Sequence, residues 1–245
     1  MQLTYLDFVD PPASSDREYV ERMILVLDHS GSMDKTDWKP SRLRGAIAAA
    51  DALIDVKARR HPDDEVGIVT FSSNAVIIHQ PVPVRSGEAS LKRALRSIAA
   101  EGFTNITAGL AEAYKHLSEK QSDDQLGRGR FDPGTWVGRL LGTSPSGATL
   151  HHEAHDSTVR RVVLLTDGEH NCGRSPQPLA AKLKARGILI DCVGIGGSPN
   201  EVDEKCLRAI ASQNGDGSVR YCFIGDKAAL IKKFEQLANR IRPAG

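Results

Sequence analysis

The chain contains an unbroken apolar segment, residues 23–27, that ends abruptly in Asp28, Ser30 and Ser32. A strand of this kind is buried on both faces, which is typical of a parallel sheet. Polar residues at the carboxyl end of such a strand lie at the edge where open α/β sheets bind their ligands. One carboxylate and two hydroxyls offer the oxygen ligands that a hard cation such as Mg2+ prefers. The sequence therefore predicts a divalent metal site at this edge of a parallel sheet.

Two later segments offer the remaining ligands. Residues 162–166 are a second apolar strand that ends in Asp167, and Thr104 lies in a loop just before a helical pattern. In this order, the motifs resemble the von Willebrand factor A-type (vWA) domain and its metal-ion-dependent adhesion site (MIDAS), over roughly residues 20–242 apart from an insertion. The resemblance implies that the two serines and Thr104 bind one divalent ion directly, while one or both aspartates act partly through water. The metal site that it implies consists of Asp28, Ser30, Ser32, Thr104 and Asp167.

Apolar segments alternate with helical patterns along the chain, which predicts a doubly wound α/β fold with helices on both faces of the sheet. The strands are expected near residues 22–28, 65–71, 75–79, 162–166, 187–194 and 218–224. The helices are expected near residues 42–59, 88–99, 108–119, 202–213 and 227–241. The turn at 72–74 is too short for a crossover, so the third strand must run antiparallel to the second. We therefore predict a mostly parallel six-stranded sheet with one antiparallel edge strand, the Rossmann-like vWA fold that the resemblance also implies.

A length of 245 residues suits one α/β domain with an insertion. We expect an N-terminal arm at residues 1–20 and a vWA domain at 21–245, interrupted by a glycine-rich insertion at about 120–157. Loops of this length without regular structure are usually functional or disordered. Whether the insertion contacts a partner or is a passive loop stays open on the sequence alone.

Composition excludes some classes of function. The net charge of +1, from 32 basic and 31 acidic residues, gives no support to a nucleic-acid role. No signal peptide and no apolar segment long enough to span a membrane is recognisable. The four cysteines include no Cys-x-x-Cys pair, which favours a reduced, cytoplasmic setting and departs from the extracellular members of the resembled family.

The ligand set suggests what the metal does. If an aspartate acts only through water, the ion keeps positive charge that attracts a carboxylate of a partner protein, and the resemblance implies the same binding mode. We therefore predict a non-enzymatic, metal-dependent protein-interaction module with Mg2+ (or Mn2+; Ca2+ fits less well) as cofactor. The resemblance to intracellular vWA proteins implies an adaptor or regulatory subunit beside an AAA+ ATPase, a kinase or a stress-response complex. The residues expected to line the rim and select the partner are His29, Met33, Phe103, Asn105, Glu169 and His170.

Three alternatives stay open. The histidine-rich segment 151–156 contains zinc-ligand residue types, although a polar loop is the more economical interpretation. A metal-dependent phosphoester hydrolase could use the same metal, with a base drawn from His29, Glu169 or His170. A scaffold could bind through the glycine-rich insertion instead. The glycines at 194–197 match no phosphate-binding fingerprint and indicate a turn.

Overall fold

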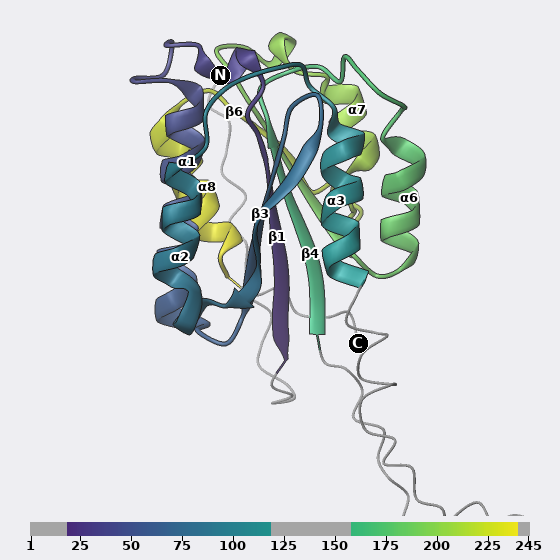
Figure 1. Ribbon diagram of the computed structural model, residues 1–245. Helices are drawn as coiled ribbons and strands as arrows, with labels where there is room; N and C mark the ends of the chain where they lie inside the picture. The colour runs from purple at the N-terminus through teal and green to yellow at the C-terminus, as the bar shows by residue number, and fades with distance from the viewer. Residues whose placement is uncertain (1–18, 119–157, 240–245) are drawn as a thin grey trace, which may run out of the picture.

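The computed structural model describes residues 19–118 and 158–239. These residues form a six-stranded sheet between two layers of helices (Figure 1), in the strand order β3-β2-β1-β4-β5-β6. Among the described strands only β3 runs antiparallel to its neighbour, β2, so the predicted mixed sheet with an antiparallel edge strand is confirmed. The strands are β1 (Val20–Asp28), β2 (Glu65–Phe71), β3 (Ala75–Pro83), β4 (Thr158–Thr166), β5 (Leu189–Ile195) and β6 (Tyr221–Ile224).

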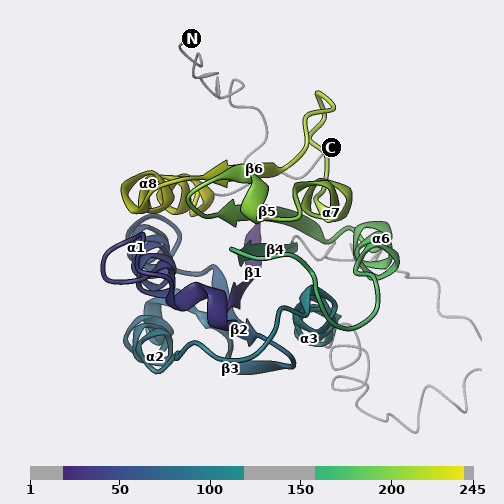
Figure 2. The same cartoon turned by 90° about the horizontal axis from the view of Figure 1, so that it is seen from above.

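The helices of the described residues divide evenly between the two faces of the sheet (Figure 2). One layer consists of α1 (Arg42–Arg60), α2 (Val84–Arg96) and α8 (Lys227–Leu237). The other layer consists of α3 (Ile106–Ser118), α6 (Gln177–Ala185) and α7 (Glu204–Ile210). Short 3-10 helices, η1 (Gly31–Asp34) and η2 (Pro199–Glu201), lie after β1 and β5. In Figure 1 the loops that follow the parallel strands gather at the top of the molecule.

The central strand β1 explains why the sheet is covered on both faces. Met23, Leu25 and Leu27 pack in one core cluster with α1, α2 and α8, whereas Ile24 and Val26 pack in the other cluster with α3. All five side chains have 0% exposure. Burial of each such side chain is worth about 1.5–3 kcal/mol, so the unbroken apolar segment requires a helical layer on either side.

Several element boundaries differ from those expected. Helix α2 begins at Val84 and not near residue 88, and α7 and β6 are shorter than predicted. Val219, expected in the last strand, forms only an isolated bridge to Gln213. Helix α6 was not predicted, because only Ala180 and Leu183 of its nine residues are buried and no apolar stripe is visible in the sequence. The N-terminal arm and the glycine-rich insertion lie outside the described residues.

A buried charged cluster lies toward the amino ends of the strands, away from the loops that follow β1 and β4. Lys57 at the end of α1 donates to Glu21 and, at 2.7 Å, to Asp64. Arg161 of β4 binds Glu21 and Asp191, and Arg220 binds the other oxygen of Asp191 at 2.9 Å. We call this set the far-end cluster, and its members are Glu21, Lys57, Asp64, Arg161, Asp191 and Arg220.

Within the two described stretches of chain, no helix has the length and apolar character needed to cross a membrane.

Candidate metal centre

The candidate site lies at the carboxyl ends of the neighbouring parallel strands β1 and β4. Asp28 is the last residue of β1, and Asp167 follows the last residue of β4 directly. The pairing of Leu27 with Leu165 places the two strand ends side by side. The segment around Gly102 is brought to the same edge because its carbonyl accepts from the backbone N–H of Gly31 at 3.0 Å. Segments that are far apart in the sequence therefore meet at one rim.

The hydroxyl groups of three predicted ligands converge there. The Oγ atoms of Ser30 and Ser32 are 3.1 Å apart, and Ser32 donates to Oδ1 of Asp167 at 2.6 Å. A β-carbon built at Gly168 would lie 3.1 Å from Oγ1 of Thr104 and 3.6 Å from Oγ of Ser32. Thr104 and Ser32 thus face the same position beside Gly168. The structure brings all five predicted residues to one place, while their binding of a metal stays a prediction.

Both oxygens of each carboxylate already accept hydrogen bonds. Oδ1 of Asp28 accepts from the backbone N–H of Ser30 at 2.7 Å, and Oδ2 accepts from the hydroxyl of Thr166. Oδ1 of Asp167 accepts from Ser32, and Oδ2 accepts from Nη1 of Arg42 at 3.1 Å. Carboxylates held in this way are suited to support hydroxyl and water ligands, the indirect role that the family resemblance implies for them. Sequence reasoning missed Thr166 and Arg42.

The electrostatics of the site favour a bound cation. Burial raises the pKa of Asp28 to about 7, although hydrogen bonds from Thr166 and Ser30 oppose the shift. Burial also raises the pKa of Asp167, against the hydrogen bond from Ser32 and the charge of Arg42. Two neighbouring buried carboxylates resist being ionised together unless positive charge is added. Three hydroxyls beside these carboxylates form an oxygen-only donor set, which fits Mg2+ or Mn2+ in chemistry.

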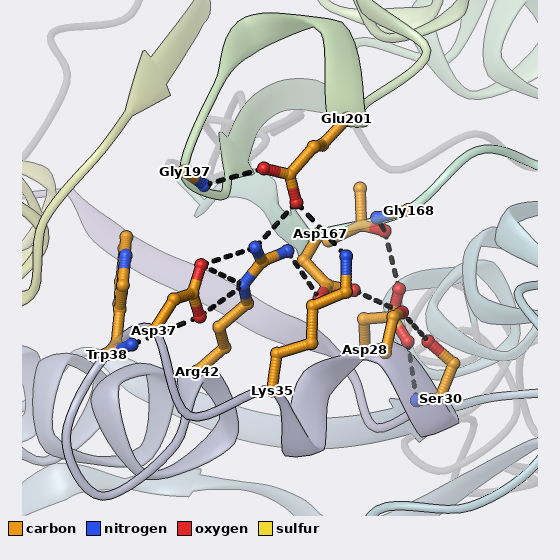
Figure 3. Close-up of polar contacts among 12 residues, drawn as sticks. Asp28, Ser30, Lys35, Asp37, Trp38, Arg42, Asp167, Gly168, Gly197 and Glu201 are labelled. Carbon is orange, nitrogen blue, oxygen red and sulfur yellow. Dashed lines mark hydrogen bonds and ion pairs between the residues drawn. The ribbon is translucent and has the colours of Figure 1, made fainter.

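Arg42 connects the site to two further carboxylates (Figure 3). Besides Asp167, its guanidinium group donates to Asp37, with Nε 2.9 Å from Oδ1, and to Glu201. Glu201 is itself held by Lys35 at 3.1 Å and by the backbone N–H of Gly197 at 3.1 Å. We call this set the Arg42 cluster, and its members are Lys35, Asp37, Arg42, Asp167 and Glu201.

The predicted rim residues divide into two groups. His29 is half-buried, with Nδ1 2.9 Å from the carbonyl of Ala99, and Phe103 and Glu169 are exposed. His29 also borders an open hollow of about 350 Å³ beside the centre, lined further by Ser72, Ser73, Asn74, Ala75, Val76, Glu101 and Gly102. Phe103 is 67% exposed, which makes it the most prominent apolar side chain at this edge.

The other rim residues turn inward. The prediction for Met33 is wrong, because η1 directs this side chain into the core, where its exposure is 0%. Asn105 accepts from the backbone N–H of Ala108 at 3.0 Å and so stabilises the start of α3. Nδ1 of His170 accepts from the backbone N–H of Ile106 at 3.3 Å. Asn105 and His170 therefore position the Thr104 loop.

The remaining motifs add no second site. In the part of the chain that the structure describes, no three His, Cys, Asp or Glu side chains gather to hold a metal, and the histidine-rich segment 151–156 lies outside that part. The glycines after β5 form a turn in which Gly197 donates to Glu201. All four cysteines are free thiols.

Comparisons with known proteins agree with the fold. Two family models, each described as von Willebrand factor type A domain, match residues 23–131 and 147–237. An uncharacterized protein of Synechocystis sp. is 28% identical over 94% of this chain and 44% of its own length. Complement C2 of Bos taurus is 25% identical over 89% of this chain and 27% of its own length. The chain thus spans less than half of these curated relatives.

A solved structure shares the fold. Proximal thread matrix protein 1 from the mussel byssus, described as having a zinc-occupied MIDAS motif, matches with a TM-score of 0.62 and 19% identity. The match covers 90% of this chain and 48% of that one. With two family matches that together span residues 23–131 and 147–237, and with a shared fold, this chain belongs to the von Willebrand factor type A domain family.

Proposed function

We propose that the protein is a metal-dependent interaction module that binds an acidic side chain of a partner protein through a divalent cation. The cation is Mg2+ or Mn2+, held by Ser30, Ser32 and Thr104, with Asp28 and Asp167 in support. The observation that carries the proposal is the convergence of three hydroxyls on two buried carboxylates at the end of the sheet. Domains of this family are usually binding modules that act through a metal, which supports the same conclusion.

The charges explain why the partner should be acidic. Asp28 and Asp167 together balance a divalent ion, but Arg42 already occupies one oxygen of Asp167. A bound ion therefore keeps net positive charge at the rim, and a carboxylate from outside is attracted to it. The exposed Phe103 and the neighbouring hollow offer apolar and polar contacts to residues beside that carboxylate.

A non-enzymatic role is part of the proposal. A hydrolase at this site would need a base near the ion. His29 and His170 each have Nδ1 within hydrogen-bonding distance of a backbone group, and Glu169 is exposed. These contacts occupy one ring nitrogen of each histidine, whereas the three hydroxyls and two carboxylates are all arranged for a bound ion. We therefore propose binding and not catalysis.

The setting is proposed as well. The four free thiols are compatible with a reducing, cytoplasmic location. An adaptor or regulatory subunit that works beside an AAA+ ATPase, a kinase or a stress-response complex is the role that we propose there.

A pull-down from the native cell extract tests the proposal, with wild type and Asp28→Ala each used in Mg2+ and in EDTA. Glu235→Ala is the matched control, because it removes an acidic side chain from the exposed face of α8. We expect a partner that wild type and the control retain only in Mg2+ and that Asp28→Ala loses.

Two results would count against the proposal. A partner that is retained by Asp28→Ala and in EDTA contradicts metal-dependent recognition. If deletion of residues 121–157 then abolishes capture, the scaffold alternative is correct. Turnover of a generic phosphate ester that disappears in Asp167→Ala would favour the hydrolase.

A further inference from the structure

Arg42 is a buried cation in direct contact with the candidate metal centre. Its side chain is only 2% exposed, and the carboxyl group of Asp167 is fully buried. Arg42 lies at the first position of α1, where its guanidinium group reaches three carboxylates from three different segments (Figure 3). The ligand pattern implied by the family accounts for Asp167 but not for this arginine.

The carboxylates around Arg42 do not neutralise its charge equally at the metal centre. The side chains of Asp37 and Glu201 are 36% and 31% exposed, so water screens their negative charge. Arg42 and Asp167 are both buried and interact in a medium of low polarity, where charge effects are strong. A cation beside Asp167 therefore experiences the positive charge of Arg42 more strongly than the negative charges of Asp37 and Glu201.

Arg42 also fixes the orientation of the Asp167 carboxylate. The guanidinium group holds Oδ2, and the carboxylate meets the hydroxyl of Ser32 with Oδ1 only. With both oxygens engaged, the group cannot rotate to offer two oxygens to one ion without breaking the contact with Arg42. The charge that Asp167 contributes to metal binding is correspondingly reduced.

We propose that Arg42 is a positioning residue that lowers the affinity of the centre for a divalent cation alone, so that tight binding needs an acidic ligand as well. This inference rests on the proposed function. In this account, Arg42 makes metal binding and partner binding depend on each other. Its buried positive charge opposes an ion that is bound alone, and the carboxylate of the partner offsets that charge. Removing the positive charge should then strengthen metal binding, which is the opposite of what loss of a merely structural residue would cause.

Calorimetric titration of the full chain with Mn2+ alone tests the inference. We expect Arg42→Gln to bind Mn2+ at least about tenfold more tightly than wild type, because a positive charge near the ion is removed. Arg42→Lys retains the charge and should stay close to wild type. Arg85→Gln is the matched control, since Arg85 is 65% exposed and lies next to the end of β3, away from the centre.

The possible results separate the two proposals. An unchanged or weaker Mn2+ affinity in folded Arg42→Gln overturns the role of Arg42. Equal affinity of wild type and Asp28→Ala contradicts the metal centre itself. Loss of binding in Asp28→Ala together with unchanged affinity in Arg42→Gln contradicts only the role of Arg42.

A second variant keeps the inference testable if Arg42→Gln does not fold. Glu201→Gln removes a negative charge that offsets Arg42 and leaves the contact between Arg42 and Asp167 in place. We expect Mn2+ affinity to fall a few-fold in this variant. An unchanged affinity there would overturn the inference.

Discussion

The two ends of the sheet use the same kinds of charged residue for different purposes. In the far-end cluster, three carboxylates meet three cations, and Lys57, Glu21 and Asp64 are each fully buried. At the opposite edge, Asp28 and Asp167 accept from two hydroxyls, one backbone N–H and Arg42. Arg42 is shared with Asp37 and Glu201. The far end has its charges balanced within the chain, whereas the metal end has negative charge that an added cation can neutralise.

This difference separates a structural role from a binding role. A buried ion pair whose members satisfy each other does not need a ligand, and breaking it leaves an unpaired buried charge. In our proposal, the site of carboxylates and hydroxyls at the rim is completed by a cation from solution. The free energy of unfolding should therefore depend mainly on the far-end cluster, and its increase in Mg2+ should depend on the residues of the candidate metal centre.

The largest effect should follow from Lys57→Met. This change removes the buried ammonium group that pairs with both Glu21 and Asp64. The free energy of unfolding should therefore fall by about 3–5 kcal/mol, with or without Mg2+. Urea denaturation measures the loss. Lys92→Met is the control, because the Lys92 pairs are partly exposed and should contribute about 1 kcal/mol or less. Equal losses in the two variants would contradict the comparison.

The next effect concerns Mg2+. At about 100 times its dissociation constant, the ion should raise the free energy of unfolding of wild type by about 2.7 kcal/mol. Asp167→Asn should lose most of this gain, because it removes a charged group from the centre. In EDTA the same variant should lose much less stability than Lys57→Met, since Arg42 keeps Asp37 and Glu201 as partners. Full Mg2+ stabilisation of Asp167→Asn would show that the rim is not the binding site.

The smallest effect on stability is expected for Gly168→Ala. The new methyl group would lie 3.1 Å from Oγ1 of Thr104, which is closer than ordinary packing allows, so Thr104 must move. Mn2+ affinity should fall several-fold, while the free energy of unfolding changes by about 1 kcal/mol or less. Gly215→Ala is the matched control, because no atom beyond the adjacent residues lies within 4 Å of its β-carbon position. Mn2+ titration and thermal unfolding of both variants would settle the point.

Local signals explain what the sequence could predict. Asp28, Ser30 and Ser32 are recognisable because they follow a buried strand directly, and Asp167 follows a second one. The mostly parallel six-stranded sheet and its antiparallel edge strand followed from the alternation of elements and one short turn, whereas the strand order came from the structure. These features depend on neighbours in the chain, which sequence patterns record well.

The missed features depend on contacts between distant segments. Arg42 occupies an ordinary helix start, and only the fold places it against Asp167. Thr166 looks like the end of a strand until its hydroxyl is seen to donate to Asp28. Met33 was expected at the rim together with the motif that it follows, but the turn of η1 directs its side chain into the core. Such side-chain orientations follow from packing in the folded chain. They cannot be read from the composition or from the periodic pattern of apolar residues.

The central claim is that Asp28, Ser30, Ser32, Thr104 and Asp167 form one divalent-cation site. Its most direct test is the electron paramagnetic resonance signal of free Mn2+ in a titration of wild type and of Asp28→Ala. We predict that wild type removes one equivalent of Mn2+ per chain from solution and that Asp28→Ala removes none. Equal uptake by both proteins would contradict the account.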